Sequence, residues 1–548
     1  MKTFRKPLLL GLLSFLTIML GQAWMVESVR KKTIATDVTE PQLPTITPTN
    51  LTLTDKSEDI TINSDVLKIR INKAGGGIYQ AQLTQYANSI NDSSPFTLFS
   101  QQEGHVYGAE TGVSGDELLL YSAGPVTQTP DSSSVVLTAK NKDGVIFKKT
   151  YTLKQGQYDI KIDTRVVNKT KTTWSGQHYT RFRGYQDTDI SQKPIPKPKD
   201  YTLDADEPKA GFMSFNTYQG PAYYSDDKPY VKTPFTEFAT KPTNTKVNQS
   251  GWICIQQRYF ISAWITDTGP REIKSSWQNG TLVDNNTSYR QLFQFDSLGT
   301  NITLAPGESA TRSAKLYAGP EVASVLAKLA NGLEFTVDYG WLWFISDLLF
   351  KTLVFIHAYL GSWGWAIVMT TLLVKILFYK MSESNYRTMA KQKKLAPRLE
   401  ALQKMYPDDP EKRSQATLEL YRKENIDPLK GGCLPTLVQI PFFAALYYVL
   451  IESVQLRHAA FYWVPDLSSH DPYFILPVAV GLAMALTNHM TPKAPDPAQA
   501  QAMMFMPILF TGMFAFAPAG LVLYWFTNNL LSAIQQWYIS KKYAKEGL

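Results

Sequence analysis

Residues 366–378 read AIVMTTLLVKILF, an apolar run typical of a membrane helix that carries one ammonium group, at Lys375. A lysine at the depth of the bilayer core costs about 2.5–3.5 kcal/mol on insertion scales, so its position requires a reason. If the helix begins near Trp365 and ends near Met381, Lys375 lies about ten residues in, and its stem reaches only part of the way to the surface. The alternative is a helix over residues 353–374 whose end Lys375 marks, with a Gly-Ser-Trp-Gly-Trp break at mid-depth. The pattern favours an interior lysine in contact with water.

Hydrophobicity is unevenly distributed along the 548 residues, which is a length typical of two or three domains. Residues from about 50 to 335 are polar with short apolar runs, and the chain turns apolar and aromatic from about residue 340. The net charge of +8 comes mostly from basic residues beside the apolar runs, as expected of loops that set membrane topology. We therefore predict no direct binding of nucleic acid. The two cysteines, Cys254 and Cys433, have no partners at metal-ligand spacing, and no metal or cofactor is predicted.

The N-terminal residues 1–26 combine a basic start with a nearly spanning apolar run. A removable signal peptide is the alternative, but Trp24 is an awkward residue after the loose cleavage pattern, so we predict an uncleaved transmembrane anchor. Residues 27–58 are rich in Thr and Pro with little periodicity, which predicts a flexible tether.

Residues 59–335 carry the signals of strands: short alternating or β-branched runs separated by Gly, Asn, Asp and Pro turns. Many short strands at this spacing favour an all-β sandwich. The motifs of zinc proteases, serine hydrolases, P-loop enzymes and EF-hands do not occur in this half. We therefore predict no catalytic residues and no enzymatic activity.

The apolar half predicts an α-helical polytopic membrane protein. Residues 336–364 are expected to hold an interfacial amphipathic helix, because Asp347 and Lys351 are four residues apart on one face. Residues 365–548 form the predicted five-helix core. Its spans are expected at about 365–381, 434–454, 473–489, 502–517 and 521–538. With the N-terminal anchor, this makes six spans.

The distribution of Lys and Arg predicts the orientation. The segment 384–430, expected to be a helical hairpin, holds eleven basic residues, whereas residues 455–471 hold only Arg457. Both termini are therefore predicted to be cytoplasmic and the strand-rich domain periplasmic. A solvated helix surface accounts for the hairpin's charge, although a hairpin at this position is also a plausible docking surface.

Polar side chains accompany Lys375 in the predicted spans. They include Thr371 on the same helix, Gln439 between two prolines, and Asn528 and Ser532 on the last span. Such residues commonly form interhelical hydrogen bonds worth about 0.6 kcal/mol each. Together with a lysine they could instead line a wet cavity. Physical reasoning alone leaves both interpretations open.

Three segments resemble the signature regions of YidC, the bacterial membrane protein insertase family. They are DYGWLWFIS at 338–346, GGCLPTLVQIPFFAALY at 431–447 and PAGLVLYWFTNN at 518–529. The order of one anchor, a large periplasmic β-domain and five clustered spans is similar to the Gram-negative form of the family. Lys375 stands where the family usually has an arginine, Lys380 where a proline is common, and Leu434 where a phenylalanine is common.

The resemblance implies an insertase and chaperone of inner-membrane proteins that hydrolyses no nucleotide. It implies a hydrophilic groove containing Lys375, Thr371, Gln439, Asn528 and Ser532. Substrate would slide along Pro441, Phe442, Phe443, Tyr524 and Trp525. The implied partners are nascent inner-membrane proteins, lipid, the Sec translocon, and the ribosome and signal recognition particle through the hairpin. A mutarotase-like sandwich is the implied fold of the periplasmic domain. A solute transporter and a membrane-anchored periplasmic carbohydrate enzyme are the alternatives, although neither internal repeats nor an intramembrane acid pair are visible.

Overall fold

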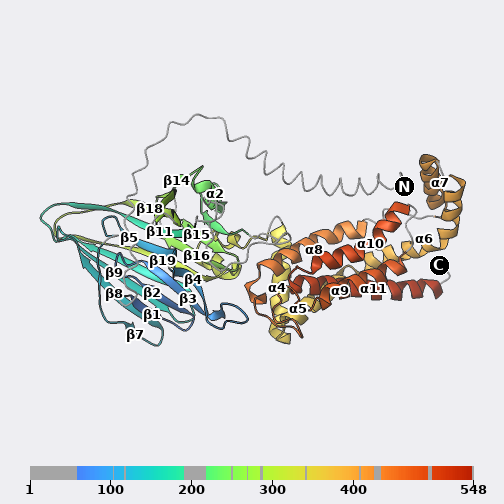
Figure 1. Cartoon of the computed structure of the whole chain (residues 1–548), viewed down its shortest axis with the longest axis horizontal. Coiled ribbons are helices and arrows are strands. Elements are labelled where there is room, and N and C mark those ends of the chain that lie inside the picture. Colours follow the sequence, from blue (N-terminus) through green and yellow to red (C-terminus); the bar gives the residue numbers. More distant parts are fainter. Residues whose placement is uncertain are drawn as a thin grey trace. The chain divides into compact units, whose positions relative to one another are not determined.

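The computed structural model divides the chain into two compact units, which we call the strand-rich unit and the helical unit (Figure 1). The strand-rich unit comprises residues 53–343 and 448–458, and the helical unit contains 344–447 and 459–548. The residues described are 59–102, 104–116, 119–189, 218–248, 251–267, 269–283, 288–339, 342–406, 409–424, 434–491 and 497–545. The predicted anchor and tether, residues 1–58, lie outside them.

The strand-rich unit is a sandwich of two antiparallel sheets, as the sequence predicts. The first has the order β1-β2-β3-β4-β5-β11-β18-β17-β14, and the second has β13-β12-β15-β16-β19-β10-β9-β8-β6, with β7 paired to β8. The strands of the first are β1 (Ile60–Asn63), β2 (Leu67–Ile71), β3 (Ile78–Ala87), β4 (Pro95–Gln102), β5 (His105–Val113), β11 (Trp174–Asp189), β14 (Asn244–Val247), β17 (Arg271–Val283) and β18 (Ser288–Leu304). Those of the second are β6 (Ser122–Ala123), β7 (Thr127–Gln128), β8 (Ser132–Lys140), β9 (Ile146–Lys154), β10 (Asp159–Val167), β12 (Gly220–Tyr223), β13 (Val231–Lys232), β15 (Trp252–Gln257), β16 (Phe260–Thr266) and β19 (Ser309–Pro320).

Alternating side chains from the two sheets form one shared core. In β9, for example, Phe147, Lys149, Tyr151 and Leu153 are buried while Lys148 is exposed. The core combines Phe99 and Phe293 of the first sheet with Phe147 and Leu316 of the second. Val454, from the short η6 (Val454–Leu456), joins the same core. The unit also contains α2 (Phe235–Phe238), α3 (Ala323–Leu329) and η3 (Leu333–Thr336).

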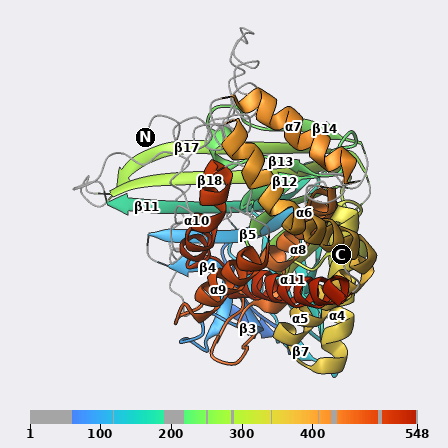
Figure 2. The same ribbon diagram turned by 90° about the vertical axis from the view of Figure 1, so that its right-hand side faces the viewer.

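The helical unit contains eight helices among its described residues. They are α4 (Trp343–Leu360), α5 (Trp363–Leu377), α6 (Tyr379–Met405), α7 (Pro410–Lys423), α8 (Leu434–Glu452), α9 (Ile475–Met490), α10 (Pro497–Phe514) and α11 (Ala519–Lys545). Helix α11 packs against α9, α5 and α6, and α10 packs against α9 (Figure 2). These helices lie where the sequence predicts its apolar runs, within a few residues at most ends.

The helix that carries Lys375 ends earlier than predicted. Gly361, with φ of +66°, follows α4, and the Ser362 hydroxyl accepts the Trp365 backbone N–H to cap α5. The alternative helix over 353–374 is therefore wrong. The prediction that α5 continues to Met381 is wrong as well, because α5 stops at Leu377 and α6 leaves at an angle of 69°.

Two helices, α6 and α7, occupy described residues of the segment 384–430 for which the sequence predicts a hairpin, and α6 starts earlier, at Tyr379. The Asp409 carboxylate accepts the Lys412 backbone N–H and caps α7, whose first residue is a proline. Leu395 and Leu399 of α6 pack with Leu420 and Tyr421 of α7.

The predicted count of six spans is not confirmed. Among the described helices, α4 is long and apolar enough to cross a membrane by itself, and α5 with α6 makes a second if the bent pair forms one span. Shorter apolar helices cover residues 439–452, 475–490 and 500–514. Asp347 and Lys351, which the sequence places on one face of this helix, form an ion pair at 2.7 Å. The interfacial position of α4 stays a prediction.

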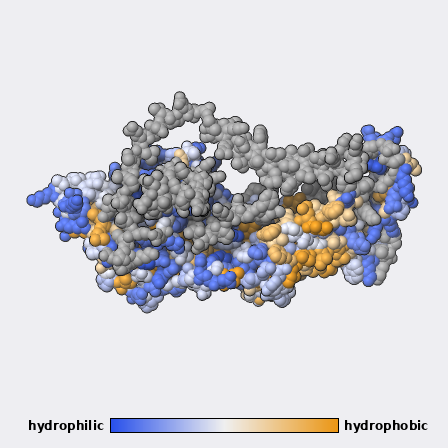
Figure 3. Space-filling model, in the orientation of Figure 1, coloured by the Kyte–Doolittle hydropathy of each residue, from blue (hydrophilic) through white to orange (hydrophobic). Residues whose placement is uncertain are grey.

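Exposed apolar side chains cover much of the helical unit (Figure 3). The exposed fraction is 67% for Leu377, 67% for Leu482 and 70% for Ile508. Such an extended apolar surface on a folded unit is typical of contact with lipid. It is the property that a membrane core requires.

Candidate functional site

Lys375 is buried in the last turn of α5, with 8% of its surface exposed. Its ammonium donates a hydrogen bond to the Ser532 hydroxyl of α11, with 2.8 Å between Nζ and Oγ. Among the described residues, no carboxylate lies within ion-pair distance of it. The helix thus carries a buried cation whose protein partner is a single neutral hydroxyl.

Ser532 is fixed by α11 and by a contact from α6. Its hydroxyl donates to the Asn528 carbonyl oxygen at 2.7 Å, four residues earlier. Its own carbonyl oxygen accepts the Tyr386 hydroxyl at 3.3 Å. Three helices, α5, α6 and α11, therefore converge at this point. The sequence analysis missed Tyr386, because it lies in a basic segment whose polar residues read as a solvated surface.

The other predicted groove residues are placed less directly. Thr371 is buried one turn before Lys375, and its hydroxyl donates to the Ile367 carbonyl oxygen at 2.7 Å. The half-buried Asn528 contributes its backbone carbonyl to Ser532. Gln439 of α8 is half-buried and makes no hydrogen bond to the other four within the described part of the chain. The structure therefore joins Lys375, Ser532 and Asn528, and leaves Gln439 outside that network.

Buried polar atoms without protein partners lie on the same three helices. In the described residues they include Thr370 Oγ1 on α5, Asn385 Oδ1 on α6, and Gln535 Oε1 and Gln536 Oε1 on α11. Buried polar groups almost always have a hydrogen-bond partner, and water supplies it where protein does not. Their positions, close in sequence to Lys375, Tyr386 and Ser532, favour a hydrated site over a dry helix contact.

An aromatic cluster connects α8, α10 and α11. Phe443 contacts both Trp525, at 4.4 Å between ring centroids, and Tyr524, at 5.8 Å. Phe510 and Phe514 of α10 also contact Trp525, at 5.8 and 5.1 Å. Three of the predicted sliding residues thus lie together, and the sequence analysis missed the two phenylalanines of α10, which read as ordinary apolar residues.

The remaining predicted sliding residues lie on α8. Phe442 packs against Phe378, at 4.9 Å between ring centroids, so it contacts the break between α5 and α6 rather than the aromatic cluster. Pro441 is half-buried inside α8, where it removes one backbone donor from the helix.

Two family models match the chain. The model described as "YidC periplasmic domain" matches residues 59–352, more than half of the chain, and the model described as "60Kd inner membrane protein" matches residues 355–546. The chain belongs to the YidC family. The family is therefore that of an inner-membrane protein with a periplasmic domain, and it accounts for both units.

Curated relatives in the YidC family cover most of the chain. A "Membrane protein insertase YidC" of Coxiella burnetii (strain Dugway 5J108-111) is 38% identical over 499 residues, covering 88% of this chain and 83% of the relative. One of Legionella pneumophila (strain Paris) is 36% identical over 576 residues, covering 99% and 98%. These relatives support membrane protein insertion and do not favour the transporter or carbohydrate-enzyme alternatives.

Two solved structures match the chain with low scores. An "Active YidC insertase crystal structure with the first transmembrane domain resolved" matches with a TM-score of 0.39 and 18% identity, covering 88% of this chain and 92% of that one. A "galactose mutarotase related enzyme" from Lactobacillus acidophilus matches 47% of this chain and 97% of its own, with a TM-score of 0.27 and 11% identity. Scores this low carry no argument about the fold or about catalysis.

Proposed function

We propose that this chain inserts nascent inner-membrane proteins into the bilayer and assists their folding, with Lys375 as the positive charge of a hydrophilic groove. The observation that carries the proposal is the state of Lys375: a buried ammonium bonded to the Ser532 hydroxyl, with no carboxylate in ion-pair distance among the described residues. A buried charge without an opposite charge requires water or an incoming anion. The polar atoms without partners on α5, α6 and α11 support water there.

The charge would attract the acidic or polar segment of an incoming chain. Two opposite charges about 6 Å apart interact by roughly 3 kcal/mol at an effective dielectric constant of 20. Water in the groove shortens the hydrocarbon that this segment must cross. The apolar part of the substrate then moves into lipid along a surface that includes Phe443 and Trp525, with the buried Tyr524 ring stacked against Phe443. Transfer of that helix, at about 25 cal/mol per Å² of apolar surface, drives the reaction without nucleotide.

A lysine suits this task as well as an arginine does. The task needs a positive point charge rather than the planar fork that binds a carboxylate through two parallel hydrogen bonds. Lys375 also makes one hydrogen bond to Ser532, which directs it without neutralising it. The lysine in place of the family's usual arginine is therefore compatible with insertion.

The orientation and the further partners also belong to this proposal. Six spans with both termini in the cytoplasm would expose the α6–α7 hairpin to the cytoplasm, where the ribosome and the signal recognition particle bring substrates. The hairpin's basic residues support a docking surface, and the packing of Leu395 and Leu399 against α7 holds its two helices together. Cooperation with the Sec translocon follows from the family resemblance alone.

The test is insertion into liposomes that contain only the purified chain, without nucleotide. One single-span reporter is made with an acidic tail and with a neutral tail. Lys375→Arg should insert both as the wild type does, Lys375→Ala should impair the acidic tail, and Lys375→Glu should impair it further. Lys541→Ala, which removes an exposed charge from α11, is the matched control.

Two results would overturn the proposal at different levels. No insertion by the wild-type chain alone would contradict an autonomous insertase. Equal losses for acidic and neutral tails would retain the insertase but contradict an electrostatic role for Lys375. Single-cysteine labelling tests the orientation: positions 404 and 545 should be cytoplasmic, and positions 91 and 458 periplasmic.

A further inference from the structure

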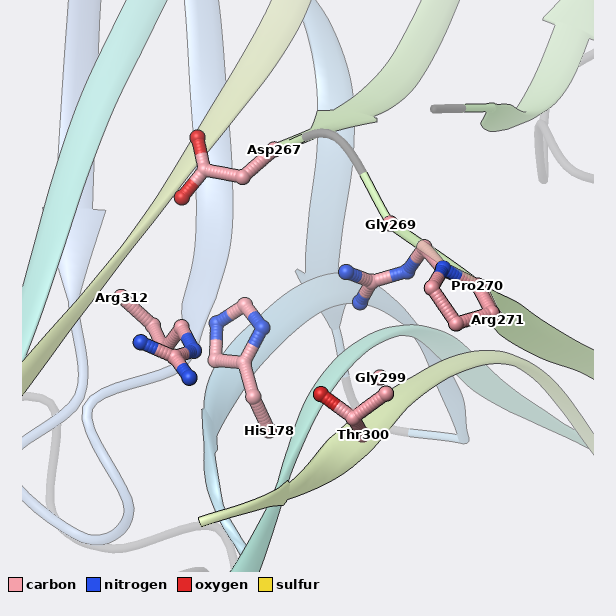
Figure 4. A pocket seen from close by; sticks show the side chains of 8 residues that line it. All are labelled: His178, Asp267, Gly269, Pro270, Arg271, Gly299, Thr300 and Arg312. Carbon is pink, nitrogen blue, oxygen red and sulfur yellow. The ribbon is translucent and has the colours of Figure 1, made fainter. Parts of the chain in front are cut away.

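A polar cavity of about 300 Å³ lies in the strand-rich unit, separate in sequence from the residues of the proposed groove. Its lining includes His178 of β11, Arg271 of β17, Thr300 of β18 and Arg312 of β19, with Asp267 in the turn between β16 and β17 (Figure 4). Four strands and a turn thus contribute polar groups to one space. The family resemblance assigns these residues no role.

Arg271 is a buried cation whose positive charge has no close negative partner. Its exposed fraction is 8%, and its guanidinium donates from Nε to the Ser297 hydroxyl at 2.8 Å and from Nη2 to the Ser297 carbonyl oxygen at 3.1 Å. Among the described residues, no carboxylate lies within 4 Å of it. Burial lowers the pKa of Arg271 to about 10 although the Asp267 carboxylate acts in the opposite direction, so the group remains charged at neutral pH. Figure 4 shows its guanidinium directed toward His178, inside the cavity.

Arg312 brings a second positive charge to the cavity. It is half-buried, its Nη1 donates to the neighbouring Thr311 carbonyl oxygen at 3.2 Å, and it lies on the other side of His178 from Arg271 (Figure 4). His178 is 3% exposed. Burial, followed by the positive charges of Arg271, Arg312 and Lys149, lowers its pKa to about 3. The imidazole is therefore neutral and offers a hydrogen bond rather than a charge.

The other residues that line the cavity leave the positive charges of Arg271 and Arg312 accessible to a ligand. Asp267 is exposed, and its Oδ2 accepts the Ser313 backbone N–H at 3.0 Å, so it neutralises neither arginine through a direct ion pair. Gly299 also lines the cavity. A Cβ added at this glycine would lie 3.4 Å from Arg271 Nη1. The absence of a side chain at this position leaves that nitrogen open to a ligand.

We propose that this cavity is a binding site for the phosphate group of a small molecule. Two guanidinium groups from different strands match the charge of a phosphate, and each can donate two parallel hydrogen bonds to its oxygens. The neutral His178 adds a hydrogen-bonding ring nitrogen, and a cavity of about 300 Å³ admits the phosphate with a short substituent. A bound phosphate would give Arg271 a direct ion pair, which the more distant Asp267 carboxylate does not provide.

The experiment is isothermal titration calorimetry on the full-length chain in detergent, with three probes. Inorganic phosphate represents a free phosphate, glycerol 3-phosphate represents a phospholipid-derived ester, and glycerol is the uncharged control. Both phosphate probes should bind and glycerol should not. The tighter of the two phosphate probes identifies the source, because an ester preference means that the cavity also contacts the substituent.

Two substitutions separate binding from folding. Arg312→Gln removes the half-exposed arginine and should weaken phosphate binding at least about tenfold, since a charge-assisted pair is lost. Arg271→Lys keeps the charge but loses the fork, and should weaken it as well. Arg258→Gln, which removes an exposed arginine outside the cavity, should leave affinity unchanged. No binding of either phosphate probe to the wild type, or full affinity in Arg312→Gln, would overturn the proposal, and insertion by these variants reports separately on the proposed groove.

Discussion

Two buried lysines, one in each unit, show opposite ways of keeping an ammonium group inside the protein. Lys149 of β9 has a fully buried side chain and pairs with the buried Asp116 carboxylate at 2.9 Å. It also donates to the Gly75 carbonyl oxygen at 2.7 Å and lies over the Tyr121 ring, 5.1 Å from its centroid. Lys375 of α5 is nearly as buried and has one neutral partner, Ser532.

The difference separates a structural charge from an available one. Lys149 is compensated by a carboxylate that two tyrosine hydroxyls also contact, those of Tyr121 and Tyr179, each at 3.1 Å. Such a site holds the two sheets together and offers nothing to a ligand. Lys375 has one hydrogen bond and no compensating charge among the described residues, so its field remains available to a substrate. Burial alone therefore does not identify a functional lysine, whereas the partner does.

The largest effect on stability should follow from breaking the ion pair between Lys149 and Asp116. Lys149→Met should lower the free energy of unfolding of the strand-rich unit by about 3–5 kcal/mol, because it leaves the Asp116 carboxylate buried without its cation. Hydrogen exchange of peptides from β9 measures this loss in the full chain. Lys148→Met, at the exposed neighbouring position, is the control and should change little. Adding Asp116→Asn to Lys149→Met should restore part of the lost stability. A Lys149→Met variant as stable as the wild type would contradict a structural role for the ion pair.

The uncompensated lysine should behave in the opposite way, with a loss of function and little loss of stability. Lys375→Ala should disfavour insertion of an acidic tail by roughly 3 kcal/mol relative to the wild type, because it removes a Coulomb attraction of that size at about 6 Å. Thermal unfolding of the variant should stay close to that of the wild type. The two quantities are measured on the same preparation, by reporter insertion into liposomes and by a thermal scan. A variant that loses insertion only because it unfolds would remove the distinction between the two lysines.

Substitution of a third buried group, the neutral imidazole of His178, should have a smaller effect on stability. This effect should depend on pH. The pKa of His178 is lowered to about 3 by burial and by Arg271, Arg312 and Lys149, whereas an unfolded histidine titrates near 6.5. Between these values the unfolded chain binds more protons, so the stability contribution is complete above about pH 6.5 and is lost as the pH falls toward 3. His178→Gln should therefore remove about 2 kcal/mol of the stability difference between pH 7 and pH 5.

Hydrogen exchange of β11 peptides at the two pH values checks this prediction, because β11 carries His178. His470→Gln, at an exposed histidine, is the control and should leave the pH dependence unchanged. The same pH dependence in wild type and His178→Gln would mean that the pKa of His178 is nearly equal in the folded and the unfolded chain, and would contradict the lowered value. An anion beside the imidazole, such as a phosphate in the cavity, would account for that result.

Much of the architecture could be predicted from the sequence, because strands and helices each give their apolar residues a characteristic spacing. Period-two runs predict the sandwich, and in β9 the same alternation places Lys149 in phase with Phe147 and Tyr151, so its burial was readable. The glycine at 361 predicts the break before α5. The family resemblance implied that Lys375 and Ser532 belong to one groove, whereas their polar character within apolar helices left a dry interhelical contact equally open.

The parts that could not be predicted depend on packing between distant segments. Nothing in Phe378-Tyr379-Lys380 is a helix breaker, yet α5 ends there and α6 leaves at 69° to pack against α11. The carboxylate that pairs with Lys149 comes from a separate loop, and no motif marks it. The cavity with Arg271 likewise joins β11 to three strands that come much later in the chain, β17, β18 and β19. Such sites follow from topology, which local periodicity does not encode.

The smallest effect should come from removing the single partner of Lys375. Ser532→Ala deletes the hydroxyl that accepts the ammonium at 2.8 Å but leaves the charge in place. In a hydrated groove, water replaces that hydroxyl, so insertion of an acidic-tail reporter should change by no more than about 1 kcal/mol, a factor of about five. Ser540→Ala, at an exposed serine of α11, is the matched control. A loss as large as that of Lys375→Ala would mean that the contact between α5 and α11, rather than the available charge, is what insertion requires. A small loss in Ser532→Ala beside a large one in Lys375→Glu would locate the function in the charge.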